Sequence, residues 1–374
     1  MKYYIIAGEA SGDLHGSNLI KELKRLDADA EVRCWGGDLM EAAGATVVKH
    51  YKQLAFMGFA EVIKNLPAIL NNLKFCKHDI ESFHPDVLVL IDYPGFNLRI
   101  AHWAKHKGFK VIYYISPQVW AWKENRVKLI RKVVDKMLVI LPFEKEFFEK
   151  KWKYKVEFVG HPLVQVVNNF LATHSTVKEK PPVVALLPGS RKQEIAKKLP
   201  IMLETSKSFP GYQFVVAKAA SLDDSFYATF LNNYPGVTAV ANQTYSLLSK
   251  ASAALVTSGT ATLETALFGV PQVVCYKGSS ISFQIAKRLV KIKYISLVNL
   301  IMDKEVVKEL IQDKLTVKNL TNELDAILHN QEIRQRIEKD YNSLKNLLQQ
   351  QSNASEKAAS IIVDFLKAIS LQEA

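Results

Sequence analysis

Short apolar runs alternate with longer amphipathic stretches along most of this 374-residue chain. In the first half, four runs rich in Val, Ile and Tyr lack polar alternation and predict strands buried on both faces, at 3–7, 86–92, 110–115 and 136–141. The second half repeats the pattern with four more predicted strands, at 183–187, 212–217, 253–257 and 272–276. Helices are expected between strands, for example over 17–26 and 69–83. This alternation indicates parallel sheets covered by helices.

The repeated pattern predicts an α/β fold of two doubly wound, Rossmann-like domains that face each other across a cleft. A polar stretch that ends at Pro181-Pro182 predicts the linker between them. We therefore expect an N-terminal domain over 1–170 and a C-terminal domain over 181–345.

The region beyond Asp303 shows helical patterning only. A C-terminal helix is expected within 346–374, with an apolar stripe formed by Ala358, Ile361, Ile362, Phe365, Leu366 and Ile369. The stripe predicts that this helical tail packs against another surface. That surface is expected either on the N-terminal domain or, after swapping, on the partner chain of a homodimer.

Composition places the chain among globular proteins. Hydrophobic residues make up 48% and charged residues 23%, which excludes disordered and collagen-like classes. The apolar runs fall short of the roughly 20 residues that span a bilayer. The apolar stretch at the N-terminus is too short for a signal peptide, so a cytoplasmic location is expected. Cys34, Cys76 and Cys275 lie far apart without a CxxC pair, which predicts buried thiols rather than disulfides or a zinc site.

The chain is strongly basic, because 49 Lys and Arg residues stand against 37 Asp and Glu residues, for a net charge of +12 at pH 7. Such an excess indicates an anionic partner, which could be nucleic acid, an anionic membrane surface or a phosphorylated substrate. Basic clusters lie within 123–136 and 287–293, although many such clusters are only solvated helix faces. The sequence shows no RRM signature, zinc finger or clear helix-turn-helix, which disfavours nucleic acid.

The first predicted strand leads into the motif Gly8-Glu9-Ala10-Ser11-Gly12-Asp13 and then a helix. Glycines at such a point let a ligand approach the backbone, and a helix N-terminus favours an anion. The motif is neither the GxGxxG fingerprint nor a P-loop, which disfavours NAD and ATP. Ser11 and Asp13 either bind a ligand or cap the helix. Glu9 lies at the strand end, where its carboxylate is expected to face the cleft.

A second loop, at 188–194, opens the second half and suits a diphosphate. It contains Ser190, Arg191 and Glu194 between a predicted strand and a helix. Arginine pairs with phosphate in a two-pronged geometry, and open sheets bind ligands at strand ends of this kind. The alternative is a solvated arginine at a turn.

A third loop follows the predicted strand at 253–257 and supplies several N–H and O–H donors from Ser258-Gly259-Thr260-Ala261. A helix that starts there would favour a phosphate. Glu264 lies one turn further on, where its carboxylate could bind ribose hydroxyls or complete a capping box. Two phosphate-suited loops in one half together indicate a nucleoside diphosphate.

Asp92 is the candidate for the reacting group. It ends a predicted strand and precedes Tyr93-Pro94-Gly95, so it is either a turn acceptor or a carboxylate that removes a proton from a sugar hydroxyl. The segment 116–122 follows the next strand and carries Trp120 and Trp122. These tryptophans belong either to the core or to an aromatic surface for an acceptor.

Eight motifs, in their order and spacing, resemble the lipid-A-disaccharide synthase family, glycosyltransferase family 19. They are GEASGD at 8–13, IDYPGFN at 91–97, SPQVWAW at 116–122, LPFEKEFF at 141–148, FVGHPL at 158–163, LLPGSR at 186–191, SGTATLE at 258–264 and KRLVKIKYISLVNL at 287–300. The resemblance implies a GT-B type fold and an inverting hexosyltransferase of lipid A biosynthesis. UDP-2,3-diacylglucosamine and 2,3-diacylglucosamine 1-phosphate would give a β-1,6-linked disaccharide and UDP, with no metal or other cofactor.

The resemblance also implies roles for the candidate residues. Asp92 would be the general base on the acceptor's 6-hydroxyl, and Glu9 and Asn299 would complete the catalytic set. Substrate and UDP binding would fall to Ser11, Asp13, Ser190, Arg191, Glu194, Ser258, Gly259, Thr260, Ala261 and Glu264. Among these, Ser190, Arg191 and the 258–261 loop would hold the diphosphate, and Glu264 would face the ribose.

An apolar stripe at helical spacing runs from Phe59 to Leu73, interrupted by Pro67. Burial in the core is the default interpretation of such a stripe. The resemblance implies acylated substrates and raises the alternative of an exposed patch that contacts acyl chains and the inner-membrane surface, formed by Val62, Ile63, Leu66, Ile69 and Leu70. The flanking basic clusters would then attract anionic lipids, and the protein would be peripherally membrane-associated.

Two other functions fit the same sequence. A UDP-sugar epimerase or hydrolase would keep the fold and use no lipid acceptor. A nucleotide-sugar-binding regulatory module would bind UDP without catalysis. The contribution of Asp92 to turnover distinguishes these from a glycosyltransferase.

Overall fold

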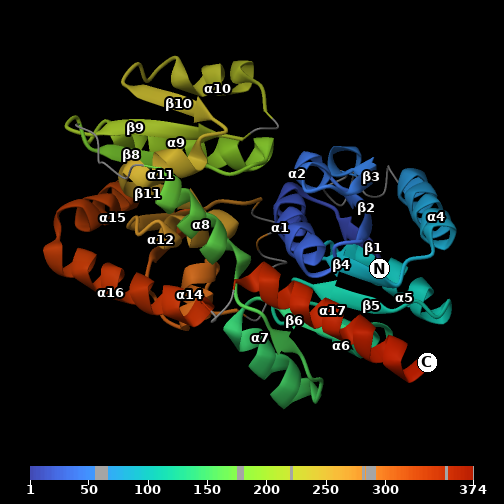
Figure 1. The fold of residues 1–374 in the computed structure, drawn as a ribbon. Helices are drawn as coiled ribbons and strands as arrows, with labels where there is room; N and C mark the ends of the chain where they lie inside the picture. Colours follow the sequence, from blue (N-terminus) through green and yellow to red (C-terminus); the bar gives the residue numbers. More distant parts are fainter. Residues whose placement is uncertain are drawn as a thin grey trace. The chain divides into compact units, whose positions relative to one another are not determined.

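The computed structural model describes residues 1–54, 66–174, 181–219, 222–279, 283, 292–349 and 353–373. The chain divides into two compact units (Figure 1). The first unit comprises Met1–Pro162 and Leu348–Ala374, and the second comprises Leu163–Leu347. No helix among the described residues has both the length and the hydropathy to cross a membrane.

The first unit contains seven parallel strands in the order β3-β2-β1-β4-β5-β6-β7. Their bounds are β1 Lys2–Ala7, β2 Glu31–Gly36, β3 Thr46–His50, β4 Val87–Ile91, β5 Val111–Tyr114, β6 Lys136–Val139 and β7 Glu157–Phe158. β1 pairs with β2 on one side and with β4 on the other. The strand order therefore reverses next to β1, as in doubly wound folds.

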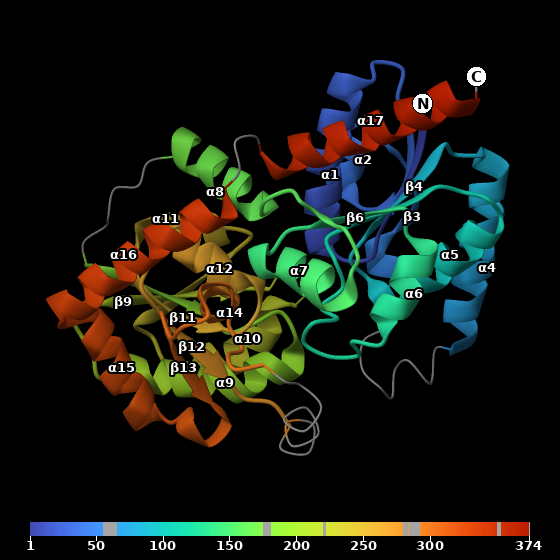
Figure 2. The ribbon, with the colours of Figure 1, turned by 90° about the horizontal axis from the view of Figure 1, so that it is seen from below.

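Helices cover both faces of this sheet. They are α1 Ala10–Leu26, α2 Asp38–Ala42, α4 Leu66–Phe83, α5 Pro94–His106, α6 Arg126–Val133, α7 Pro142–Glu146 and α17 Ala354–Glu373, with short helical turns at Tyr51–Gln53 and Phe147–Lys151. α4 contacts α5 and α5 contacts α6, so these three form one layer (Figure 2). Right-handed crossovers run from β1 to β2 in one direction and from β3 to β4 in the other, which places α1 on the face opposite to α4. There α17 packs along α1 (Figure 2).

The core of the first unit lies under the α4–α5–α6 layer. Tyr4 and Ile6 of β1 and Leu88 and Leu90 of β4 belong to it, together with Cys76, Ile100 and Ile130 of the covering helices. Because side chains alternate along a strand, Tyr3 and Ile5 point to the opposite face. All of these side chains are fully buried, which explains why the strands lack polar alternation.

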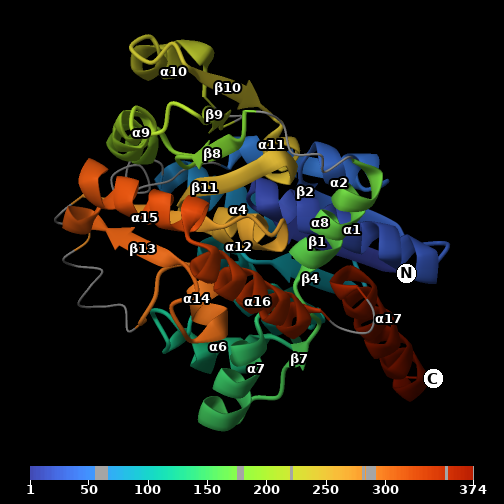
Figure 3. The same cartoon turned by 90° about the vertical axis from the view of Figure 1, so that its left-hand side faces the viewer.

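The second unit contains six parallel strands in the order β10-β9-β8-β11-β12-β13 (Figure 3). Their bounds are β8 Val183–Leu187, β9 Gln213–Lys218, β10 Val237–Ala241, β11 Ala251–Thr257, β12 Gln272–Tyr276 and β13 Lys308–Ile311. The helices are α8 Pro162–Thr173, α9 Lys192–Ser206, α10 Asp224–Leu231, α11 Thr244–Lys250, α12 Thr260–Leu267, α14 Leu297–Met302, α15 Val317–His329 and α16 Gln331–Leu348, with a short turn at Gln312–Lys314. The strand order reverses between β8 and β11.

These two parallel sheets confirm the predicted fold class, and the eight predicted strands are present. The prediction of helices alone beyond Asp303 is wrong, because β13 pairs in parallel with β12 at the sheet edge. Lys308 is exposed, and only Leu310 of this four-residue strand is buried. An edge strand of this kind lacks the continuous apolar run that marks a central strand.

The predicted stripe of the C-terminal helix is buried at its centre. Ala358, Ile362 and Leu366 of α17 are buried, whereas Phe365 and Ile369 are half-buried. Arg25 of α1 forms an ion pair with Glu356 at 2.9 Å. The helix therefore contributes to the hydrophobic core of the first unit.

We predict that Ile362→Ala lowers the free energy of unfolding by about 2–5 kcal/mol, because it leaves a cavity under α17. Ile369→Ala, at a half-buried position of the same helix, should cost clearly less. Urea unfolding of both variants tests this. Equal losses of stability in the two variants would contradict the packing of α17 against α1. A loss of stability that appears only when the protein is diluted would indicate that the helix is exchanged between chains.

Candidate active site

Each sheet has one point at which the strand order reverses, and open α/β sheets bind ligands at the carboxyl ends of the strands there. In the first unit β1 and β4 lead into residues 8–13 and 92–97 at that point. In the second unit β8 and β11 lead into residues 188–191 and 258–261. Most of the predicted site residues therefore lie at the two reversal points, and each unit is described by itself.

Asp92 follows β4 directly, in a left-handed backbone conformation with φ of 43°. Desolvation by the surrounding protein and the nearby Glu9 carboxylate raise the pKa of Asp92 to about 7, against an opposing hydrogen bond from the backbone N–H of Tyr93. The side chain nonetheless reaches solvent, which screens part of this effect. A carboxyl group with a pKa near neutrality can both accept and release a proton at the working pH.

Asn97 holds the turn that carries Asp92. Its buried amide Nδ2 lies within hydrogen-bonding distance of three carbonyl oxygens, those of Asp92 at 2.8 Å, Ile91 at 3.2 Å and Ile6 at 3.4 Å. The Tyr113 hydroxyl donates to the same Asp92 carbonyl at 2.5 Å. Since Ile6 belongs to β1 and Ile91 to β4, one amide joins both strand ends at the reversal point. The sequence motif IDYPGFN contained this residue, but its spacing gave it no role.

Gly8 lies beneath the ring of Tyr93. A Cβ at position 8 would stand 2.4 to 2.6 Å from three ring atoms of Tyr93, so the close approach requires glycine. The Tyr93 ring also stacks on Phe96, with 5.6 Å between centroids. Tyr93 has φ of 48° and directly follows Asp92. Gly8 therefore fixes the turn on which the Asp92 carboxylate is mounted.

Asp13 has a structural task in this unit. Its buried carboxylate accepts hydrogen bonds from the backbone N–H groups of Gly37 at 2.7 Å, Met40 at 3.1 Å and Leu39 at 3.2 Å. These groups belong to the start of α2, which otherwise has no side-chain cap. Asp13 thus caps α2 rather than its own helix. Ser11 is exposed in the first turn of α1, and the binding roles of both residues stay predictions.

Glu144 is a buried carboxyl group that the sequence analysis did not single out. It accepts hydrogen bonds from the backbone N–H groups of Leu141 at 3.0 Å and Ile140 at 3.3 Å and from Trp120 Nε1 at 3.2 Å. Burial raises the pKa of Glu144 to about 7, and the charge of Asp92 contributes to the rise. Glu144 therefore orients the Trp120 indole.

In the second unit, Gly189 and Thr257 shape the reversal point. Gly189 has φ of 121°, a conformation that favours glycine. The Thr257 hydroxyl at the end of β11 donates to the Pro188 carbonyl beyond β8 at 2.7 Å. This hydrogen bond joins the two strand ends, so the loop that starts α9 is held against the end of β11.

Basic groups surround the start of α9. Arg191 lies at the N-terminus of α9 with an exposed side chain, and its Nη1 is 3.4 Å from Glu194 Oε1. Lys198 lies one turn beyond Glu194 and is almost completely buried, with its ammonium 3.9 Å from Glu194 Oε2. Burial lowers the pKa of Lys198, and Glu194 opposes that change. Together with the α9 dipole, two cations against one carboxylate favour an anion here.

The 258–261 loop starts α12. Gly259, with φ of 148°, is its N-cap, and no atom of the described residues lies within 4 Å of the position of a Cβ there. The N-terminal N–H groups of α12 are therefore not covered by a cap side chain. Thr260 is exposed and Ala261 half-buried, whereas the Ser258 hydroxyl donates to the Ile295 carbonyl at 2.8 Å. The loop can offer backbone donors to a phosphate.

Glu264 is oriented by a tyrosine and does not cap α12. Its Oε1 accepts a hydrogen bond from the Tyr245 hydroxyl at 2.7 Å. Burial raises the pKa of Glu264, and the bond from Tyr245 opposes that rise. The contact with ribose stays a prediction.

Asn299 is completely buried and fully engaged within the fold. Its Oδ1 accepts from the backbone N–H groups of Val306 and Val307, and its Nδ2 donates to the Val307 carbonyl and to Glu309 Oε1, all at 2.8 to 3.0 Å. Glu309 also accepts hydrogen bonds from Ile295 and Ser296. Asn299 and Glu309 thus fasten α14 to β13, and a catalytic role of Asn299 stays a prediction.

The predicted apolar patch is only partly described. Val62 and Ile63 lie outside the described residues, and Leu66 begins α4. Ile69 packs partly against the core of the first unit, whereas Leu70 is 51% exposed. The stripe therefore serves the core at Ile69 and faces solvent at Leu70. Within the described part of the chain, His, Cys, Asp and Glu residues form no group that could hold a metal ion.

Comparison with known proteins adds a family and a fold. A family model described as lipid-A-disaccharide synthetase matches residues 3–363. Lipid-A-disaccharide synthases of Geobacter metallireducens and Coxiella burnetii are 39% and 37% identical to this chain; each alignment covers 97% of it, and 96% and 98% of the relatives respectively.

Solved structures resemble the whole chain. The UDP-GlcNAc 2-epimerase of Neisseria meningitidis bound to UDP-GlcNAc has a TM-score of 0.69 at 13% identity, covering 98% of this chain and 100% of its own. The glycotransferase of kitacinnamycin has a TM-score of 0.67 at 14% identity, covering 97% and 98%. At these identities the likeness shows the GT-B type of fold alone.

We predict that Asp92→Asn stabilises the protein at alkaline pH. The folded-state pKa is raised to about 7 from 3.8, so the wild type loses stability as the pH rises from about 4 through 7, because the folded state then holds a disfavoured charge. The asparagine variant carries no such charge. Its free energy of unfolding should match that of the wild type near pH 4 and exceed it near pH 8. Urea unfolding at both pH values measures the difference.

The exposed Asp29→Asn variant is the control for loss of one carboxylate. It should not reproduce this pH-dependent gain. If Asp92→Asn and Asp29→Asn changed stability alike at both pH values, the raised pKa of Asp92 would be refuted.

Proposed function

The chain belongs to the lipid-A-disaccharide synthetase family, and we propose that it joins UDP-2,3-diacylglucosamine to 2,3-diacylglucosamine 1-phosphate. Membership makes it a glycosyltransferase of lipid A biosynthesis. The products of the proposed reaction are a β-1,6-linked disaccharide 1-phosphate and UDP. The observation that supports this most is the family match over residues 3–363, which includes both reversal-point loops of each unit.

Asp92 is the proposed general base. The acceptor's 6-hydroxyl oxygen attacks the anomeric carbon of the donor, and its proton passes to the Asp92 carboxylate. As the new C–O bond forms, the bond between that carbon and the UDP oxygen breaks, which inverts the anomeric centre. A pKa near 7 suits this task, because a base is most effective when its pKa lies near the working pH. Glu9 keeps the carboxylate basic through its like charge.

The second unit is the proposed UDP-binding unit. Backbone N–H groups at the starts of α9 and α12 would receive the diphosphate, and Arg191 would form a two-pronged contact with it. Donors and cations fixed in advance stabilise the charge that develops on the leaving UDP. Buried Lys198 adds positive potential at the same loop. Glu264, oriented by Tyr245, would hold the ribose.

Both proposed sugar substrates carry acyl chains, so we propose that the protein works at the cytoplasmic surface of the inner membrane. Leu70 and Phe75 are large apolar side chains of α4 with 51% and 46% of their surface exposed. Exposed apolar side chains next to basic residues favour binding to an anionic membrane surface.

We predict that the purified protein, supplied with both acylated substrates in detergent and EDTA, releases UDP and forms the disaccharide. Asp92→Ala should lower turnover by about 10²- to 10⁴-fold, because the base is lost, and should leave UDP affinity intact. Arg191→Ala should weaken UDP binding on the order of 10- to 100-fold, because it removes a charged contact.

Mass spectrometry of the products and titration of UDP provide the two measurements. Free or epimerised sugar without disaccharide would favour the hydrolase or epimerase alternative. UDP binding without any turnover would favour a regulatory binding module.

The pH dependence of kcat/KM tests the coupling between Glu9 and Asp92. Because the base must be deprotonated, activity should rise with pH and reach half its limit near pH 7. Glu9→Gln removes a like charge, so the pKa of Asp92 should fall and the acidic limb should move to lower pH. Burial, the larger cause, remains and keeps the pKa above its ordinary value. An unmoved acidic limb in Glu9→Gln would show that Glu9 does not set the acidity of the base.

A further inference from the structure

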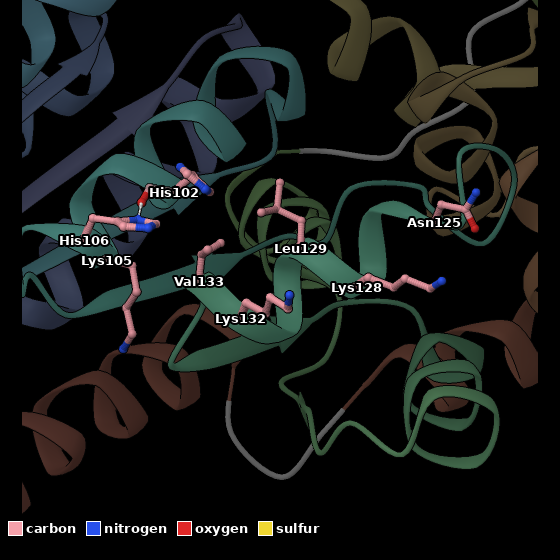
Figure 4. Close-up of a pocket in the computed structure, with 8 residues that line it drawn as sticks. All are labelled: His102, Lys105, His106, Asn125, Lys128, Leu129, Lys132 and Val133. Carbon is pink, nitrogen blue, oxygen red and sulfur yellow. Dashed lines mark hydrogen bonds between the residues drawn. The ribbon is translucent and has the colours of Figure 1, made fainter.

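An open groove of about 670 Å³ runs between α5 and α6 of the first unit (Figure 4). Five of its eight lining residues are basic in type: His102, Lys105, His106, Lys128 and Lys132. Among the residues that the structure describes, no acidic one lines it. The sequence analysis noted the basic run within 123–136 but could not place the α5 residues beside it.

The positive charge of the groove is only partly compensated. Lys105 forms an ion pair with Asp135 of the loop before β6, and Asp135 also accepts a hydrogen bond from the backbone N–H of Val111. Lys128 and Lys132 are exposed and make no ion pair with any residue of the described ranges. Four residues apart on α6, their side chains lie on one helix face and can reach a common anion.

The groove is separate from the proposed reaction site. α5 starts at Pro94, just after Asp92, and ends at His106, so its last turn lies near the amino ends of the strands. His102, Lys105 and His106 come from this last part of the helix. The α5 wall of the groove and Lys132 in the last turn of α6 therefore lie at the end of the strands opposite to Asp92.

The neighbouring helix of the same layer is apolar at its surface. α4 contacts α5 and exposes Leu70 and Phe75. A cationic groove beside exposed apolar side chains suits the interface of an anionic membrane, where phosphates lie above acyl chains. Nucleic acid fits less well, because no Phe, Tyr or Trp of the described ranges lines the groove to stack on a base.

We propose that the α5–α6 groove binds the phosphate of an anionic membrane lipid, with Lys128 and Lys132 as its principal cations. Lys105 and the two histidines line the opposite wall on α5 (Figure 4). The groove would hold the first unit on the membrane by its α4–α5–α6 face. This inference rests on the proposed membrane association and assigns it a headgroup site.

Vesicle binding of the full chain tests the inference. Cosedimentation is measured with phosphatidylcholine vesicles with and without phosphatidylglycerol. The wild type should bind only when the anionic lipid is present, and Lys128→Gln/Lys132→Gln should weaken that binding about thirtyfold, because each lysine near such a surface contributes about fivefold.

The control variant is Lys21→Gln/Lys367→Gln, which removes the same charge from exposed positions on α1 and α17, the opposite face of the first unit. It should bind like the wild type. Equal weakening in both double variants, or none in the groove variant, would overturn the proposal. If inorganic phosphate occupies the groove but the groove variant still binds the vesicles like the wild type, the proposal is also overturned.

Two further measurements separate this site from the proposed reaction. Urea unfolding of the groove variant reports that the first unit remains folded, which UDP affinity cannot do because UDP is assigned to the other unit. Disaccharide formation in detergent reports the reaction without a bilayer. Failure of the lipid site therefore appears as unchanged vesicle binding, whereas failure of the proposed function appears as absent disaccharide in the wild type.

Discussion

The hydrogen bonds of the Asn97 amide join the ends of β1 and β4 where the strand order reverses. A left-handed aspartate costs conformational energy, and here the Asp92 carbonyl is held by both Asn97 and Tyr113. The Asp92 carboxylate can therefore be fixed at the strand end without help from a ligand. Everything proposed for the reaction at Asp92, including the raised pKa and the coupling to Glu9, depends on that fixed position.

In the second unit the two strand ends at the reversal point are also joined by a side chain, but by a hydroxyl instead of an amide. There a single hydroxyl, that of Thr257, joins the ends of β8 and β11 through the Pro188 carbonyl. The first reversal point carries two carboxyl groups, those of Glu9 and Asp92, whereas the second has Arg191 and Lys198 against Glu194. Opposite potentials suit the two tasks that we propose, taking up a proton and holding a diphosphate.

Sequence patterns predicted what depends on continuous apolar runs or on loop composition. The central strands and the loops at 8–13, 92–97, 188–194 and 258–264 are of this kind. The patterns did not predict strands with charged positions, such as β2 with Glu31 and Arg33 and the edge strand β13. They also did not predict roles that arise only on folding. No local spacing shows that Asp13 caps a helix 25 residues away or that Asn299 donates a hydrogen bond to Glu309.

Gly8 carries no functional group, yet the Tyr93 ring rests where its Cβ would be. Random mutagenesis scored by activity would therefore rank this position beside the residues that perform chemistry. A map of intolerant positions drawn from such a screen would mix reactive groups with the bare backbone that supports them. Distinguishing the two requires asking, for each glycine, which neighbour occupies the space that it leaves.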